Sequence, residues 1–206
     1  MVYVFLADGF EELEALAPVD MLRRARVDVK TVKVGGDAVP QGKIMKKITE
    51  ALSAPDAPQM LEANSRNNIR VLADMYESEI KSDGLEMIVL PGGMPGADNL
   101  HESERVRELI AHCVSNSIKI GAICAAPSVL ARLGWLKGVK ATAFPAFRHY
   151  LADGGADVGG ASVITDGIFT TADGVLSSID FALELVRVLK GGEWAQAVGT
   201  DRPAPE

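Results

Sequence analysis

Short β-rich apolar runs alternate along this chain with segments of helical periodicity. The run MVYVFLA precedes a helical segment from about Glu11 to Arg26, and the apolar runs EMIVL and IKIGAI each lead into a further helical segment. Runs that are apolar at consecutive positions are typical of strands covered on both faces. The alternation therefore predicts an α/β fold in which a mostly parallel sheet has helices on both faces.

The same patterns indicate the other elements. Further strands are expected at VDVKTVKV, IRVLAD, SVITDG and IFTTADG. Helical stripes are formed by Leu13, Leu16, Ala17, Met21 and Ala25, by Val106, Leu109, Ile110, Cys113 and Val114, and by the apolar terminal run VLSSIDFALELVRVLKGG.

Length and charge narrow the kind of protein. The chain has 206 residues, and we expect a single domain over residues 1–206. With 28 acidic against 21 basic residues, its formal charge of −7 repels phosphate backbones and anionic membrane surfaces, so neither nucleic acid nor a membrane is an expected partner. Two cysteines cannot supply the disulfide framework of small secreted folds, and the sequence has no signal-peptide pattern or membrane-spanning run. A cytoplasmic location is expected.

Residues 41–64 interrupt the alternation of strands and helices. Ile44, Ile48 and Leu52 have helical spacing and are followed by SAPDAP, which cannot continue a helix. We interpret the segment as an insertion that decorates the surface, a short amphipathic helix with a proline-rich return. A lid or partner-binding arm is the alternative. Residues 200–206 are expected to form a flexible tail.

Loops that follow three strand-like runs are expected to meet at the carboxyl edge of the sheet. These loops are DGFEE, PGGMPGADN and CAAP. The glycine-rich loop lacks the Lys-Ser or Lys-Thr of a phosphate-binding P-loop, but its N–H groups could hold a developing oxyanion. No metal site is expected, because His, Cys and carboxylate residues are not clustered with metal-ligand spacing.

Cys124 stands where an apolar strand meets a helix, in the stretch GAICAAPSVL. A free cysteine is commonly a buried packing residue, and Cys113, on the apolar stripe of its helix, fits that description fully. The small residues around Cys124 instead allow the tight turn of a nucleophile elbow, although the G-x-S-x-G pattern is absent. The helix N-terminus would favour a thiolate there. Spacing alone leaves both interpretations open.

Glu11, at the turn before the first helix, is the candidate acid at this edge. An acidic residue in the first turn of a helix is explained by the helix dipole alone, and Glu12 and Glu14 fit that description better. If Glu11 lies beside Cys124, it must be protonated for a thiolate to form, which makes it a proton carrier.

Several motifs together resemble a known family in their order and spacing. GFEELEALAPVDMLRRA, MIVLPGGMPGADNL, GAICAAPSVLARLGWLKG and TDGIFTTADG are similar to the DJ-1 branch of the ThiJ/PfpI superfamily, and the resemblance covers nearly the whole chain except residues 41–64. It implies a flavodoxin-like three-layer α/β sandwich, a homodimer, and a cysteine on a strained elbow beside a protonated glutamate. Matched motif to motif, these are Cys124 and Glu11, and the amides that hold an oxyanion are those of Gly93 and Ala125.

The activities implied by this resemblance depend on the cysteine and need no cofactor. The substrates are reactive dicarbonyls such as methylglyoxal or early glycation adducts, and the role is linked to carbonyl or oxidative stress. The alternative is a redox sensor without turnover that uses oxidation of Cys124. Phe144 stands where some relatives have histidine, and Ala125 stands where amidotransferases and peptidases have histidine after the cysteine. Peptidase and glutamine amidotransferase activities are therefore not expected.

Overall fold

A seven-stranded sheet forms the centre of the protein, with the strand order β10-β11-β7-β6-β1-β2-β5. The computed structural model describes residues 1–35, 61–202 and 205. Neighbouring strands of the central sheet are parallel except β10 and β11, which form an antiparallel hairpin at one edge. The mostly parallel α/β sheet expected from the sequence is confirmed.

The strands and helices have the following bounds. The central strands are β1 (Val2–Ala7), β2 (Val29–Val34), β5 (Met75–Tyr76), β6 (Met87–Leu90), β7 (Lys119–Ile123), β10 (Val163–Asp166) and β11 (Phe169–Ala172). Two smaller sheets pair β3 (Glu62–Asn64) with β4 (Arg70–Leu72) and β8 (Lys140–Ala141) with β9 (Asp157–Val158). The helices are α1 (Glu12–Arg24), α3 (Gly96–Glu102), α4 (Glu104–Ser115), α5 (Pro127–Arg132), α6 (Arg148–Asp153), α7 (Ser178–Lys190) and α8 (Gly192–Gly199).

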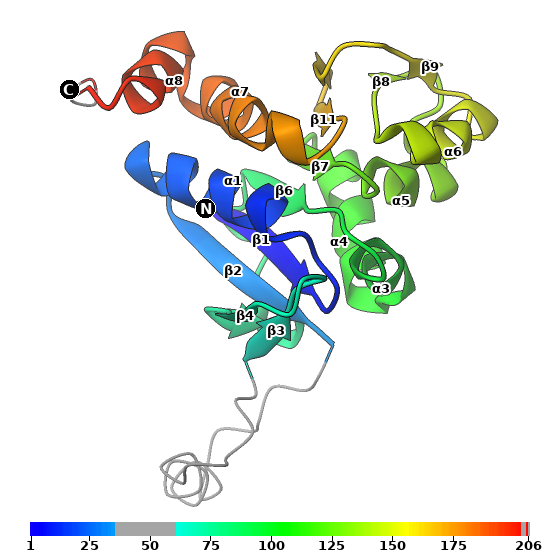
Figure 1. Ribbon diagram of the computed structural model, residues 1–206, viewed down its shortest axis with the longest axis horizontal. Helices are drawn as coiled ribbons and strands as arrows, with labels where there is room; N and C mark the ends of the chain where they lie inside the picture. The colour runs from blue at the N-terminus through cyan, green and yellow to red at the C-terminus, as the bar shows by residue number, and fades with distance from the viewer. Residues whose placement is uncertain (36–60, 203–204, 206) are drawn as a thin grey trace, which may run out of the picture.

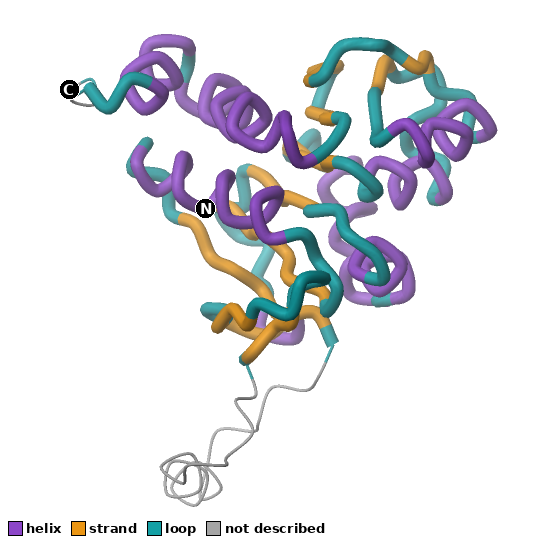
Figure 2. The backbone as a smooth tube through the Cα atoms, in the orientation of Figure 1, coloured by secondary structure: helices purple, strands orange, loops and turns teal. Residues whose placement is uncertain are grey.

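Helices cover both faces of the sheet, because successive side chains of a strand point to opposite faces. In β1, Val2 and Val4 join the core formed with α1, α7 and α8, whereas Tyr3 and Phe5 join the core formed with α3, α4 and α5. α1 and α7 pack side by side on their face (Figure 1). Figure 2 shows the strands lying between the helical layers. The result is the three-layer sandwich predicted from the sequence.

The first helix buries a different face from the one that its leucines suggest. Leu13 and Leu16 are 60% and 38% exposed, whereas Ala15, Val19 and Leu22 are buried. The buried face packs against the sheet and α7. The first two members of the predicted stripe, Leu13 and Leu16, therefore point outward and leave apolar surface uncovered, whereas its last member, Ala25, is buried in the core.

Residues 41–64, which we interpret as an insertion, lie partly outside the described residues. The predicted helix with Ile44, Ile48 and Leu52 lies outside them, and the described end of the insertion, residues 61–64, contains β3. The expected strand IRVLAD is β4, which pairs with β3 and not with the central sheet.

At the C-terminal end, α7 is the expected apolar helix, and Gly191 follows it. A further helix, α8, comes after it and is not indicated by the sequence pattern. Of the expected flexible tail, residues 203–204 and 206 lie outside the described residues, while Arg202 N donates a hydrogen bond to Ala197 O.

In the part of the chain that the structure describes, no helix combines the length and the apolar character required to cross a membrane.

The expected meeting of three loops at one edge of the sheet is confirmed. β6 lies between β1 and β7, so the residues that follow Ala7, Leu90 and Ile123 emerge at the same carboxyl edge. The first two loops are joined by a hydrogen bond of 3.0 Å from Glu11 N to Gly92 O. This edge carries the candidate site.

Candidate active site

Cys124 occupies a sharp turn between β7 and α5. Its φ of +63° is unusual for a residue with a side chain, and such strain persists only where neighbouring structure holds it. Two backbone hydrogen bonds of 2.9 Å do so, one from Cys124 N to Ala172 O and one from Phe144 N to Cys124 O. The side chain is partly buried and lines a pocket. Cys124 therefore has the backbone geometry of an elbow residue.

The carboxyl group beside Cys124 belongs to Glu14, so the prediction that Glu11 occupies this place is wrong. Glu14 is fully buried and lies within hydrogen-bonding reach of the thiol. Glu11 is the N-cap of α1, and its Oε2 accepts a 2.9 Å hydrogen bond from Glu14 N. Both acids line the same pocket, and Glu11 is therefore a neighbour of the pair.

A signal for Glu14 was present in the sequence. Glu14, Pro18 and Leu22 recur at four-residue intervals and lie on the buried face of α1. An acidic residue in line with buried apolar residues cannot be explained by the helix dipole alone. The exposed leucines on the other face concealed this periodicity.

Gly92 makes the close approach of the pair possible. Its N–H donates a 2.9 Å hydrogen bond to Glu14 Oε2. A Cβ at this position would lie 2.7 Å from both Cys124 Cβ and Glu14 Oε2, which is too close for a real contact. The other carboxyl oxygen, Oε1, is buried and has no hydrogen-bond partner among the described residues.

The amides of Gly93 and Ala125 both point toward the thiol, as expected from the sequence. Hydrogen bonds from these two N–H groups act to lower the pKa of Cys124, because they stabilise negative charge on sulfur. Gly93 has a φ of +88°, and a Cβ there would lie 2.6 Å from Glu11 N. A glycine is therefore required where this loop contacts the one before α1.

Burial and mutual repulsion set the ionisation of the acid and the thiol. Burial, together with the negative charge of Glu11, raises the pKa of Glu14 to about 7, although hydrogen bonds with Cys124 and Gly92 act to lower it. Burial, and then the negative charge of Glu14, raise the pKa of Cys124 to about 12. The amide of Ala125, just before α5, acts in the expected direction, but burial and Glu14 outweigh it and the net shift of the Cys124 pKa is upward. Near neutral pH the pair carries at most one negative charge, and moving one proton from sulfur to carboxyl gives a thiolate beside a neutral acid.

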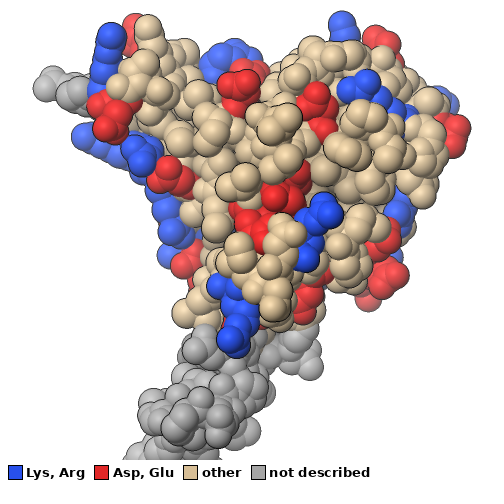
Figure 3. Space-filling view, in the orientation of Figure 1, with Lys and Arg blue, Asp and Glu red and all other residues tan. Residues whose placement is uncertain are grey.

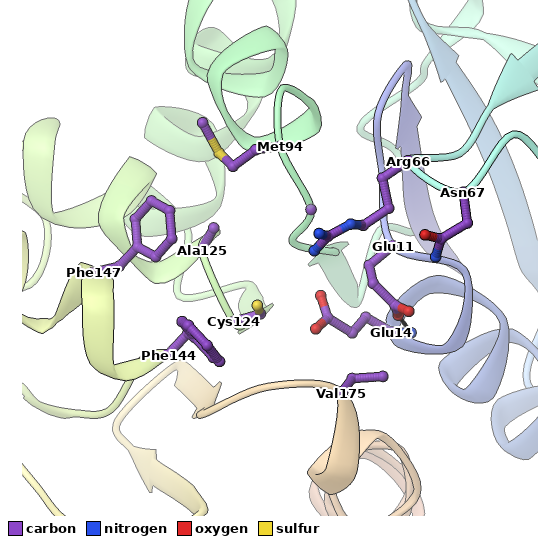
Figure 4. A pocket seen from close by; sticks show the side chains of 11 residues that line it. Glu11, Glu14, Arg66, Asn67, Met94, Cys124, Ala125, Phe144, Phe147 and Val175 are labelled. Atoms are coloured by element: carbon purple, nitrogen blue, oxygen red, sulfur yellow. Dashed lines mark hydrogen bonds between the residues drawn. The ribbon is translucent and has the colours of Figure 1, made fainter.

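The pocket around the pair has a volume of about 350 Å³. One wall is polar and the other apolar, with Cys124 between them (Figure 4). The lining residues are Glu11, Glu14, Arg66 and Asn67 on the polar side, Phe144 and Phe147 on the opposite side, Met94 and Val175 at the top and bottom of the view, and Gly93, Cys124 and Ala125 near the centre. In the space-filling view, acidic side chains gather near the middle of the molecule with a basic side chain beside them (Figure 3).

Arg66 is a pocket residue that the sequence analysis did not identify. It lies in the hairpin between β3 and β4, and its guanidinium points into the cavity (Figure 4). Its positive charge acts to lower the pKa of Glu14. No sequence motif links it to the site, because the hairpin comes from outside the central sheet.

Glu12 holds this hairpin against α1. Its two carboxyl oxygens accept hydrogen bonds from Ser65 Oγ, at 2.5 Å, and from Asn67 Nδ2, at 2.9 Å. Burial acts to raise the pKa of Glu12, but these hydrogen bonds outweigh it and the net shift is downward. The role given to Glu12 from the sequence, that of a helix-dipole residue, is therefore incomplete.

The remaining candidate residues have clear places. Cys113 is fully buried on α4, where packing explains it and burial raises its pKa to about 12. Phe144 lines the pocket, at the position where the family resemblance indicates a histidine in some relatives. A thiol–histidine dyad at that position is therefore not available.

Taken together, these features define a flavodoxin-like α/β protein with a cysteine on an elbow and a buried acid beside it. A family model described as DJ-1/PfpI family matches residues 1–188, and the chain belongs to this family. Protein dj-1beta of Drosophila melanogaster is 31% identical over 196 residues, which are 95% of this chain and 92% of that protein. The resemblance noted in the sequence is confirmed.

Two further relatives bear on structure and activity. The structure titled Toxoplasma gondii DJ-1, oxidized, matches with a TM-score of 0.82 and 29% identity, covering 97% of this chain and 96% of that one. A Caenorhabditis elegans protein named glutathione-independent glyoxalase DJR-1.2 is 30% identical over 124 residues, 60% of this chain and 66% of that protein. The family thus includes a protein named as a glyoxalase.

Proposed function

We propose that this protein is a cofactor-free, cysteine-dependent enzyme that converts 2-oxoaldehydes such as methylglyoxal into 2-hydroxy acids. The observation that carries the proposal is the convergence of Cys124, Glu14 and the amides of Gly93 and Ala125 on one pocket. This arrangement combines a nucleophile, a proton carrier and an oxyanion site. The similarity to a protein named glutathione-independent glyoxalase supports the same reaction class. Early glycation adducts of these dicarbonyls are a second substrate class for the same residues.

The first step is addition of sulfur to the aldehyde. Glu14, as a carboxylate, accepts the proton of Cys124 while Sγ bonds to the aldehyde carbon. The aldehyde oxygen takes the electron pair of its π bond and lies between the amides of Gly93 and Ala125. Protonation of this oxygen by Glu14 gives a hemithioacetal and restores the carboxylate.

The second step moves a hydrogen between adjacent carbons. Glu14 removes the proton from the former aldehyde carbon, and the electron pair forms the C=C bond of an enediolate, with the negative charge on the oxygen of the neighbouring former carbonyl. The hydroxyl proton on the sulfur-bearing carbon moves to that oxygen. Return of the proton from Glu14 to the neighbouring carbon, as the C=O bond forms next to sulfur, gives a thioester of the 2-hydroxy acid and restores the carboxylate. Water then cleaves the thioester, which releases the acid and restores the thiol. One carbon is oxidised and its neighbour reduced, so no external oxidant or reductant is consumed.

The test is lactate formation from methylglyoxal by the purified protein. Cys124→Ala should abolish turnover. Cys113→Ala is the matched control, because this thiol is buried in the core of α4 and should leave turnover within a few-fold of the wild type. Turnover that survives in Cys124→Ala would refute the proposal.

An alternative role is redox sensing through Cys124. Cys124 is partly exposed at the pocket whereas Cys113 is fully buried, so the two thiols differ in access although burial raises both pKa values. The related Toxoplasma protein is titled as oxidized. Mass spectrometry after mild peroxide treatment should find Cys124 oxidised before Cys113. Equal oxidation of both would remove the basis for this role.

A further inference from the structure

Apolar side chains form the pocket wall that faces Glu14. Phe144 and Phe147 form this wall, and Met94 and Val175 add apolar surface at the edges of the pocket. Met94, Phe144 and Val175 are 40%, 45% and 38% exposed. In Figure 4 the two phenylalanines lie on the opposite side of Cys124 from Arg66 and the carboxylates. Exposed apolar surface gathered in a cavity is typical of a binding site, because a ligand can remove it from water.

Phe144 is held next to the reactive sulfur by the backbone. Its N–H bonds the carbonyl of Cys124, and its own carbonyl accepts a 2.8 Å hydrogen bond from Phe147 N. A Cβ placed on Gly174 would lie 3.2 Å from Phe144 Cδ2 and 4.0 Å from Cys124 Sγ. The ring and the sulfur therefore border the same small space, which Gly174 leaves open.

Methylglyoxal would use little of this wall. Once its aldehyde carbon is bonded to Sγ and its oxygen lies at the amides of Gly93 and Ala125, only a methyl group remains to contact the apolar side. A cavity of about 350 Å³ has room for a larger group. A phenyl or branched alkyl substituent attached to the same dicarbonyl would reach Phe144 and Phe147.

We propose that the pocket selects 2-oxoaldehydes with an aromatic or branched aliphatic substituent over methylglyoxal, and that Phe144 determines this preference. The inference rests on the proposed function for its reaction and adds the substrate class. The apolar wall binds the substituent, while Glu14 and the amides act on the dicarbonyl end, as in the proposed reaction.

The first test compares kcat/KM for phenylglyoxal and methylglyoxal, each normalised to its rate of reaction with a free thiol. The wild type should prefer phenylglyoxal by at least tenfold. Phe144→Ala should lower this ratio about tenfold, mainly through KM for phenylglyoxal, and Phe144→Leu should give an intermediate ratio. Leu72→Ala is the matched control, since Leu72 is 63% exposed on β4 and does not line the pocket. An unchanged ratio in Phe144→Ala would overturn the proposal.

A second measurement separates this inference from the proposed reaction. Mandelate and lactate, the two product acids, share their 2-hydroxycarboxylate end and differ in the phenyl group. Binding to Cys124→Ala, followed by NMR titration, should be at least tenfold tighter for mandelate, and addition of Phe144→Ala should remove the difference. This result would support the specificity of the pocket even if neither aldehyde were turned over. Equal binding of both acids alongside measurable turnover would overturn the specificity and leave the proposed function standing.

Discussion

Glu14 lies beside Cys124 with one carboxyl oxygen bonded to a backbone amide and the other, Oε1, buried without a partner among the described residues. The thiol of Cys124 is within hydrogen-bonding reach of this buried carboxyl group, and burial favours the form of the carboxyl that carries a proton and no charge. The pair therefore works as one proton-sharing unit. Each of the first three expectations below follows from this relationship.

Glu14→Gln should lower turnover of methylglyoxal by about 10²-fold or more, because glutamine keeps the shape of the side chain but cannot move a proton. Glu11→Gln is the matched variant. Glu11 caps α1 and lines the pocket without contacting the thiol, so its loss should cost less than about tenfold in turnover. Steady-state kinetics of both variants decide between the two acids. Greater loss in Glu11→Gln would restore the role first expected for Glu11.

The pKa of Glu14 should also govern stability. Its raised value of about 7 means that the folded protein binds one more proton than the unfolded chain between pH 4.5 and 7. Stability should therefore fall as pH rises through this range, by on the order of 3 kcal/mol. Urea unfolding at pH 5 and pH 8 should show this loss in the wild type, a smaller loss in Glu11→Gln, whose Glu14 pKa is less raised, and none in Glu14→Gln. A parallel loss in Glu14→Gln would assign the effect to another group.

Turnover should rise with pH through about 7, because Glu14 must be ionised to accept a proton. Arg66→Met removes a positive charge that lowers the pKa of Glu14, so its midpoint should move to higher pH. Glu11→Gln removes a negative charge that raises it, so its midpoint should move to lower pH. The measurement is the pH profile of kcat/KM for each protein. Shifts in the same direction for both variants would contradict the electrostatic explanation.

We propose that two copies associate through the apolar surface on α1 and at the start of α7. Leu13 and Leu16 are exposed on α1. Leu176, which is 99% exposed, lies just before α7, and Ile179, which is 50% exposed, lies in its first turn. Both groups are close in sequence to pocket residues, and the two helices pack together. Leu176→Arg should weaken a dimer measured by light scattering at micromolar concentration, whereas Leu72→Arg on β4 should not. A monomeric wild type would refute the proposal.

Much of the architecture could be predicted from local patterns. Consecutive apolar residues in β1, β6 and β7 indicate strands covered on both faces, and a chain of strand–helix units indicates a parallel sheet. The carboxyl ends of neighbouring parallel strands meet at one edge, so the position of Cys124 at that edge followed from the order of elements, whereas its role there was implied by the family resemblance. Gly93 and Ala125 were predicted by motif and lie where the motif places them.

The identity of the acid was decided by the rotation of α1 about its axis. Glu11 is the N-cap, Glu12 and Glu14 stand in the first turn, and the exposed Leu13 and Leu16 obscure in the sequence which face of the helix meets the sheet. Packing on the sheet and α7 places Glu14 at the thiol and leaves Glu11 to cap the helix. Glu12 is turned instead toward the β3–β4 hairpin.

The sequence by itself determined which chemical groups follow which strands: acids follow β1, glycines follow β6 and a cysteine follows β7. Only the tertiary structure decided which acid shares a proton with Cys124, that burial raises both pKa values, and that Arg66 and Phe144 face each other across the pocket. The physical reason is that desolvation and charge depend on distances between segments remote in sequence, whereas periodicity records only neighbours along one element.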